Sequence, residues 1–86
     1  MNNKIIIEKK AKKELLHIPK EWIPPLVEAI DALSHNPRPP ACKKLTGKDG
    51  YRLRRAKHRI LYTIDETKHQ IIIYRVSHRR EVYREY

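Results

Sequence analysis

The sequence has a single cysteine, only two glycines and no long run of apolar residues. One cysteine cannot form an intrachain disulfide, which suits a reducing compartment, and we expect a cytoplasmic protein. No stretch approaches the roughly 20 apolar residues that a membrane-spanning helix needs. Met1–Ile5 lacks the apolar segment of a secretory signal, so we expect neither export nor a membrane partner. Gly47 and Gly50 are too few for a glycine-rich phosphate-binding loop.

Acidic residues are scarce relative to basic ones. Ten Asp and Glu stand against 20 Lys and Arg, which gives a formal net charge of +10 in 86 residues. Eight of the nine arginines lie after position 43, and Arg38 is the exception. Arginine presents a planar fork of donors that matches phosphate oxygens. The second half of the chain therefore predicts a surface that binds a polyanion, with nucleic acid as the first candidate. The alternative is a basic domain whose charge serves only solubility.

Metal-binding side chains are scattered along the chain. His17, His35, His58 and His69 have no ligand spacing with one another or with Cys42. We therefore expect no metal site. Trp22 and the aliphatic residues at helical spacing are predicted to form core, and we expect no cofactor.

Hydrophobic periodicity predicts one α+β domain over residues 1–86. Lys4–Ile7 is short and β-branched, which is typical of a strand. Two amphipathic helices are expected, the first over residues 8–17 and the second from about residue 22 to Asn36, with two prolines in its first turn. Residues 36–50 contain three prolines and two glycines and predict a loop.

Three more strands are expected after this loop. Residues 51–55 and 58–64 alternate in polarity, and residues 71–76 form a continuous β-rich run after a turn at 65–68. The order β-α-α-β-β-β predicts an antiparallel sheet of about four strands with both helices packed on one face.

Alternation divides the strand residues into two faces. One apolar set should face the helices, and it comprises Tyr51, Leu53, Ile60, Tyr62, Ile64, Ile72, Tyr74 and Val76. The opposite set places four guanidiniums on the open face, those of Arg52, Arg54, Arg59 and Arg75. A solvated strand face usually carries charges of both signs, whereas no acid occupies these four positions. The pattern therefore favours anion binding on the open face.

Several short motifs follow one another in a fixed order along the chain. They are Asn36-Pro37-Arg38-Pro39-Pro40, Lys43-Lys44-Leu45, Tyr51-Arg52-Leu53-Arg54, Arg59-Ile60-Leu61-Tyr62 with Ile64-Asp65, and Val76-Ser77-His78-Arg79-Arg80-Glu81-Val82-Tyr83. Together they resemble the RelE/ParE toxin superfamily, and most closely its RelE branch. The resemblance runs from about residue 5 to residue 83, and the family's fold is a sheet with two helices on one face.

The resemblance implies a toxin of a prokaryotic toxin–antitoxin pair. RelE members enter the ribosomal A site and cut mRNA there, with the ribose 2′-OH as nucleophile and without a metal. Their products carry a 2′,3′-cyclic phosphate and a 5′-OH. The partners implied for this chain are a cognate antitoxin protein, the ribosome and mRNA.

The resemblance also implies a set of catalytic residues, which comprises Arg52, Arg54, Arg59, Arg79 or Arg80, and Tyr83. RelE has two lysines where this chain has Arg52 and Arg54, and these arginines stay protonated and cannot act as a general base. They suit the negative charge that grows on a phosphorane.

The proton acceptor must then be another residue. His78 is the first candidate, because an unperturbed imidazole titrates at about pH 6.5. Tyr83 is the second candidate, unless it stacks on an RNA base, and Lys57 is the third. We further expect Lys44, Lys57 and Arg75 to contact nucleic acid.

Two other functions stay open. A ParE-type inhibitor of DNA gyrase has the same fold and no RNase activity, although ParE members generally lack Arg52, Arg54, Arg59 and Tyr83 as a set. A non-enzymatic, basic nucleic-acid-binding module would use the same arginines for binding alone.

Overall fold

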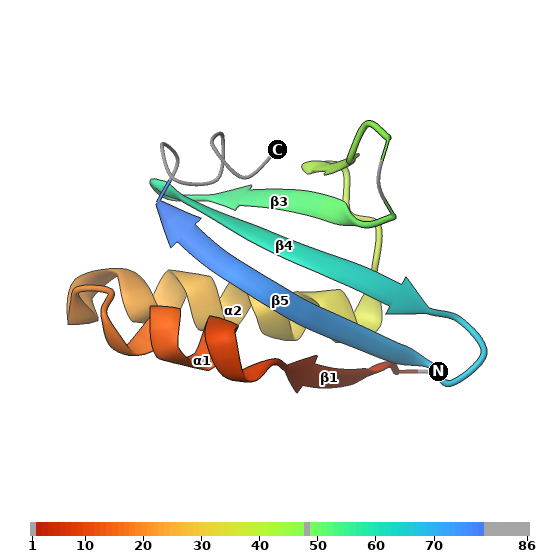
Figure 1. Ribbon diagram of the computed structural model, residues 1–86, viewed down its shortest axis with the longest axis horizontal. Helices are drawn as coiled ribbons and strands as arrows, with labels where there is room; N and C mark the ends of the chain where they lie inside the picture. Colours follow the sequence, from red (N-terminus) through yellow and green to blue (C-terminus); the bar gives the residue numbers. More distant parts are fainter. Residues whose placement is uncertain (1, 48, 79–86) are drawn as a thin grey trace.

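The structure, a computed structural model, describes residues 2–47 and 49–78 and shows a mixed α+β fold (Figure 1). The elements are β1 (Lys4–Ile7), α1 (Lys9–Leu16), the 3-10 turn η1 (Lys20–Trp22), α2 (Ile23–His35), β2 (Cys42–Lys44), β3 (Tyr51–Arg55), β4 (His58–Asp65) and β5 (Gln70–His78). The predicted fold class, with both helices on one side of the sheet, is confirmed. No helix in the described part of the chain is long and apolar enough to cross a membrane.

The sheet has five strands in the order β1-β5-β4-β3-β2. All neighbouring pairs are antiparallel except β1 and β5, which are parallel. The expectation of about four antiparallel strands is therefore incomplete. The missed strand is β2, which pairs with β3 from Cys42 opposite Leu53 to Lys44 opposite Tyr51. Three residues between turn-forming segments are too short to show alternation, so the sequence predicted only a loop there.

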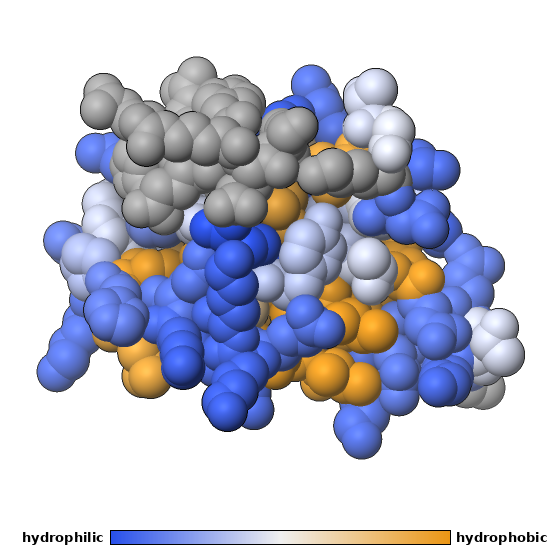
Figure 2. All heavy atoms as spheres, in the orientation of Figure 1, coloured by the Kyte–Doolittle hydropathy of each residue, from blue (hydrophilic) through white to orange (hydrophobic). Residues whose placement is uncertain are grey.

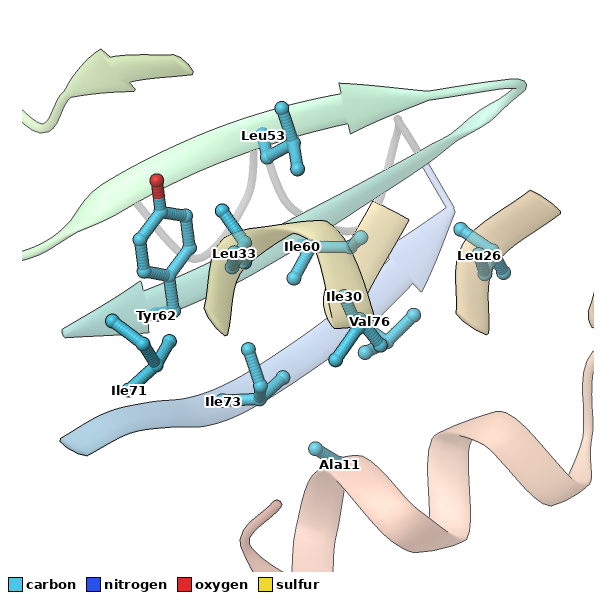
Figure 3. Close-up of a cluster of buried hydrophobic side chains, with 10 residues drawn as sticks. All are labelled: Ala11, Leu26, Ile30, Leu33, Leu53, Ile60, Tyr62, Ile71, Ile73 and Val76. Atoms are coloured by element: carbon cyan, nitrogen blue, oxygen red, sulfur yellow. The ribbon is translucent and has the colours of Figure 1, made fainter. Parts of the chain in front are cut away.

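The main core lies between the sheet and the two helices (Figure 3). Its buried members come from α1, α2 and the three strands β3, β4 and β5, and they are Ala11, Leu26, Ile30, Leu33, Leu53, Ile60, Tyr62, Ile71, Ile73 and Val76. Pro24 and Pro25 lie in the first turn of α2, where backbone N–H groups have no partner within the helix. The helix ends before Asn36-Pro37, as expected.

An extra residue in β5 changes which of its side chains face the helices. Tyr62 pairs with Ile73 and Leu61 pairs with Arg75, so Tyr74 forms a β-bulge between them. Ile73 is fully buried in the main core, whereas Tyr74 packs against a second cluster that contains Leu61. The prediction that Ile72 and Tyr74 face the helices is therefore wrong. Strict alternation fails at a bulge, because one inserted residue moves all later side chains by one position.

A carboxylate from α1 holds the second half of β5 in place. β1 pairs only with the first four residues of β5, and α1 packs beside the remainder. Glu14 accepts hydrogen bonds from the backbone N–H of Val76 (2.9 Å), from Nε of Arg75 (3.0 Å) and from the hydroxyl of Ser77 (3.1 Å). A second guanidinium nitrogen of Arg75 lies 2.9 Å from the same carboxylate. We call these contacts the Glu14 network, and they replace a strand at this part of the sheet edge.

The hairpin between β3 and β4 contains a strained residue. Arg55 pairs with His58, so Ala56 and Lys57 form a two-residue turn, and Ala56 has φ 55°. A Cβ atom disfavours this left-handed conformation by roughly 1–2 kcal/mol, and glycine avoids that cost. We expect Ala56→Gly to raise the free energy of unfolding by about 0.5–1 kcal/mol in urea denaturation. Ala32→Gly, on the exposed side of α2, should instead lower it by about 1 kcal/mol. Equal effects of both substitutions would contradict strain at Ala56.

Tyr62 connects the sheet to the segment after α2. Its hydroxyl donates a hydrogen bond to the carbonyl of Pro37 (2.7 Å), and its ring stacks on Tyr51 with centroids 5.6 Å apart. Burial raises the pKa of the Tyr62 phenol, and a hydrogen bond with Cys42 raises it further. The folded protein therefore holds this phenol proton more tightly than the unfolded chain does.

This raised pKa predicts a loss of stability at alkaline pH. The stabilisation is complete below the unfolded tyrosine pKa of about 10 and falls as the pH rises above it, by at most about 1.4 kcal/mol per pH unit. At pH 8 we expect Tyr62→Phe to be less stable by about 1 kcal/mol, because it lacks the hydrogen bond to Pro37. Above pH 10 the difference in stability between the parent and Tyr62→Phe should narrow, because only the parent has this phenol to deprotonate. Urea unfolding at several pH values measures this difference, and a difference that stays constant with pH would contradict the raised pKa of Tyr62.

Candidate nucleic-acid interface

Two rows of side chains cross the face of the sheet that points away from the helices. The register aligns Lys43, Arg52, Leu61 and Arg75 in the first row, and Arg54, Arg59 and Ser77 in the second. Residues paired in this way point to the same side of a sheet. Their sequence neighbours Leu53, Ile60 and Val76 lie in the core against the helices. We call the two rows the basic face, and the register agrees with the predicted alternation for all four arginines.

Two arginines lie directly opposite each other within the second row. Arg54 of β3 pairs with Arg59 of β4, and Arg52 lies two positions before Arg54 on the same face. Arg54 is exposed, whereas Arg59 is only 1% exposed. Like charges in directly opposed positions destabilise a sheet. An anion at this point would contact the exposed Arg54, and the positive charge of the buried Arg59 would add to its attraction.

Arg75 belongs to the basic face but has a structural partner. Its guanidinium makes two contacts with the Glu14 carboxylate and donates a further hydrogen bond to Ser77 (2.7 Å). The side chains of Arg75 and Glu14 are only 10% and 19% exposed. The Glu14 network thus gives Arg75 a role in the fold, and its expected contact with nucleic acid stays a prediction.

The two lysines predicted to contact nucleic acid lie off the basic face. Lys44 pairs with Tyr51, a residue of the helix-facing set. Lys57 lies in the β3–β4 turn with its ammonium 5.8 Å from the ring centroid of Trp22, on the helix side. Lys43, which sequence reasoning missed, pairs with Arg52 and completes the first row. Alternation would have identified it if β2 had been recognised as a strand.

Arg38, the arginine of the first half, holds the loop after α2 to the sheet. Its Nε donates a hydrogen bond to the hydroxyl of Tyr51 (3.0 Å), and its guanidinium pairs with Glu66 at 2.6 Å. The guanidinium carbon also lies 5.3 Å from the centroid of the Tyr51 ring. The hydrogen bond that Arg38 donates to Tyr51, followed by the one it donates to Glu66, raises the pKa of Arg38 above its usual value. This arginine therefore serves the fold at the end of the sheet opposite the Glu14 network.

Comparison with known proteins identifies the family. A model of the family described as "ParE toxin of type II toxin-antitoxin system, parDE" matches residues 5–83. The chain belongs to the RelE/ParE toxin superfamily. It is accordingly a toxin of a type II toxin–antitoxin system. No curated protein matches the sequence.

Solved structures of RelE proteins share the fold of this RelE/ParE toxin. The RelBE2 toxin–antitoxin complex from Mycobacterium tuberculosis is 28% identical, with a TM-score of 0.81 over 92% of this chain and 100% of that chain. The RelE–RelB complex from Pyrococcus horikoshii OT3 is also 28% identical, with a TM-score of 0.81 over 92% and 97%. A mutant of the Escherichia coli toxin RelE in the free state is 26% identical, with a TM-score of 0.79 over 99% and 94%.

The C-terminal part of the expected site of this RelE/ParE toxin is only partly described. The backbone of His78 ends β5 and pairs with His58, one position after Ser77 of the basic face. The side chain of His78 lies outside the described part of the structure, as do Arg79, Arg80 and Tyr83. Their catalytic roles stay predictions from the sequence. Among residues 2–47 and 49–78, no group of three His, Cys, Asp or Glu side chains is placed to hold a metal ion.

Proposed function

We propose that this toxin is a ribosome-dependent endoribonuclease that cleaves mRNA in the ribosomal A site. The observation that carries the proposal is the position of Arg52, Arg54 and Arg59 together on the face of β3 and β4 that points away from the helices. The similarity to RelE structures, at 26–28% identity over nearly the whole of both chains, supports it.

The proposed reaction needs only the RNA and protein side chains. The ribose 2′-oxygen attacks the neighbouring phosphorus, the P–O5′ bond breaks, and the products carry a 2′,3′-cyclic phosphate and a 5′-OH. A base takes the proton of the 2′-OH, and an acid returns one to the leaving 5′-oxygen. Donors fixed around the phosphorus stabilise the charge that grows in the transition state.

The arginines of the basic face can stabilise the negative charge of the transition state, but they cannot carry out the proton transfer. Arg52, Arg54 and Arg59 stay protonated, so they can hold the phosphate oxygens but cannot accept a proton. The base must come from a titrating group near them. His78 follows directly after the second row and is our first candidate, with Tyr83 as the second.

An antitoxin is the partner we propose for the resting state. Several of the similar structures are complexes of a RelE toxin with its antitoxin. This chain carries a net charge of +10, and its sheet ends in the short edge strand β2 on one side and in β1 on the other. An acidic or amphipathic segment that covers the basic face would neutralise the charge and block RNA. We place the action of the toxin in the cytoplasm, where it would meet ribosomes.

The description of the matching family favours a second candidate function. That family model is named for ParE toxins, and ParE-type members inhibit DNA gyrase without cleaving RNA. The same basic face would then contact DNA or an acidic surface of the gyrase.

One experiment separates these functions. The purified toxin is added to a translating extract, the ends of the mRNA are mapped, and a gyrase supercoiling assay is run with the same preparation. We expect cuts at A-site codons, with 2′,3′-cyclic phosphate ends, and normal supercoiling. Inhibited supercoiling with intact mRNA would show ParE-type activity instead. Intact mRNA with normal supercoiling would contradict both activities and favour the third function, a nucleic-acid-binding module without enzymatic activity.

A further inference from the structure

Glu14 contacts the sheet next to the basic face, and it is the only acidic residue of α1. The four lysines of this helix, Lys9, Lys10, Lys12 and Lys13, are exposed, and Figure 2 shows hydrophilic side chains gathered over α1 on the face that is in view. The side chain of Glu14 is only 19% exposed. A carboxylate removed from water in this way needs charged or hydrogen-bonded partners within the fold. The role of Glu14 is therefore defined by the groups that it holds.

The carboxylate of Glu14 binds three consecutive residues of β5. One oxygen, Oε1, accepts the backbone N–H of Val76 at 2.9 Å. The other oxygen, Oε2, accepts Nε–H of Arg75 at 3.0 Å and the hydroxyl of Ser77 at 3.1 Å. The backbone N–H of a strand residue points along the plane of the sheet. Glu14 therefore lies beside the edge of β5, at a point where β1 has already ended.

The residues that Glu14 holds belong to the strand that lies opposite Arg59. Arg75 and Ser77 are the residues that β5 contributes to the two rows of the basic face. Ser77 pairs with Arg59 of β4, and the backbone of His78 follows directly. Residues in directly opposite positions have Cβ atoms about 4.5–5.5 Å apart. A movement of β5 at this point would therefore displace the immediate neighbour of Arg59.

Glu14 takes the place of a neighbouring strand along this part of β5. Within the described part of the chain, no strand pairs with residues 74–78 on the side of β5 that faces away from β4. We infer that Glu14 is a positioning residue for the cleavage reaction, because it fixes residues 75–77 and thereby the places of Arg59 and of the backbone of His78. A displacement of about 1 Å can slow a reaction by about 10²-fold. This inference rests on the proposed function, in which Arg59 stabilises the transition state and His78 is the first candidate for the base.

The charge of Glu14 allows positioning to be separated from binding. Its carboxylate lies 2.9 Å from a guanidinium nitrogen of Arg75, so the pair carries no net charge. Glu14→Gln removes one negative charge from the toxin, which does not weaken its electrostatic attraction to the phosphates of the ribosome. An amide has one acceptor oxygen, however, and its NH2 group must face one of the donors of β5. Glu14→Gln should therefore loosen β5 without weakening ribosome binding.

Single-turnover cleavage of mRNA on programmed ribosomes tests the inference. The rate at saturating toxin concentration reports the cleavage step, and the toxin concentration that gives half of this rate reports binding. For Glu14→Gln we expect a saturating rate lower by about 10–10²-fold. The half-saturating concentration should be no higher than that of the parent. The matched control is Glu28→Gln, which makes the same change at the exposed pair of Glu28 and Arg55 and should cleave at the parent rate.

Two further variants separate the position of β5 from the stability of the domain. Ala32→Gly lowers stability on the exposed side of α2 and should leave the saturating rate unchanged. Glu14→Asp keeps the charge and both acceptor oxygens but is one methylene shorter, so we expect a lower rate with unchanged binding. All rates are measured at a temperature at which circular dichroism shows that the variant is folded. If Glu14→Gln does not fold, Glu14→Asp provides the test.

Three outcomes would overturn the inference. A folded Glu14 variant that cleaves at the parent rate would show that Glu14 does not set the position of β5. A higher half-saturating concentration with an unchanged rate would assign Glu14 to binding. An equal loss of rate in Ala32→Gly would reduce the effect to overall stability. In each of these cases the parent still cleaves mRNA, whereas intact mRNA with the parent itself would overturn the proposed function and this inference together.

Discussion

Replacing Arg59 with methionine is expected to slow mRNA cleavage by about 10²–10³-fold, a typical loss for one donor that stabilises transition-state charge. Arg59 lies on the basic face opposite Arg54 and is 1% exposed. Methionine is a flexible apolar side chain that fills irregular space, so the packing around this position should survive. Single-turnover cleavage on programmed ribosomes measures the rate, and a thermal melt followed by circular dichroism measures the fold.

Arg38→Met is the matched control for this substitution. It makes the same chemical change at an arginine that is engaged with Tyr51 and Glu66, away from the basic face. We expect it to cleave mRNA at nearly the parent rate. A folded Arg59→Met protein that cleaves as fast as the parent would remove Arg59 from the phosphate-binding assignment.

Glu14→Ala is expected to lower the free energy of unfolding by about 3 kcal/mol, in the lower part of the range for breaking a buried ion pair. The substitution takes away the carboxylate that Arg75 contacts twice and that accepts the N–H of Val76. A domain of this size loses roughly 4–8 °C in Tm for each kcal/mol, so Tm should fall by at least about 12 °C. Urea unfolding and a thermal melt provide the two measurements.

A second ion pair between a helix and the sheet, that of Glu28 with Arg55, provides the control for Glu14→Ala. Glu28 of α2 lies 3.8 Å from Arg55 of β3, and both side chains are largely exposed. Such surface pairs contribute about 0–1 kcal/mol, so Glu28→Ala should change stability little. If Glu14→Ala and Glu28→Ala had the same small effect, the Glu14 network would not hold the second half of β5.

Local signals in the sequence were sufficient for much of the fold. The β-branched residues of Lys4–Ile7 were sufficient to predict the first strand. Asn36-Pro37 correctly predicted the end of α2, because the residue before a proline avoids the helical conformation. The shared face of Arg52, Arg54 and Arg59 also followed from alternation, since β3 and β4 pair without interruption over these residues. In each case the information lies within a few neighbouring residues.

The features that sequence reasoning missed depend on contacts between distant segments. The bulge at Tyr74 exists only relative to β4, and a bulge has no side-chain pattern of its own. Arg75 shares the parity of the other arginines, but its partner Glu14 lies 61 positions earlier in the chain. The pairing of Lys43 with Arg52 likewise requires β2 to be recognised from its neighbour.

The position of β5 between β1 and β4 has a consequence for how the toxin is synthesised. Among the strands that the structure describes, β1 is the first to emerge from the ribosome, and its pairing partner in the sheet, β5, is the last. Contacts between such distant segments form slowly, because the chain loses the entropy of closing a long loop before the contacts can stabilise it. A nascent chain that has not yet released residues 70–78 lacks the strand that joins β1 to the rest of the sheet. The basic face is therefore incomplete until residues 70–78 have left the ribosome, because β5 contributes Arg75 and Ser77 to its two rows.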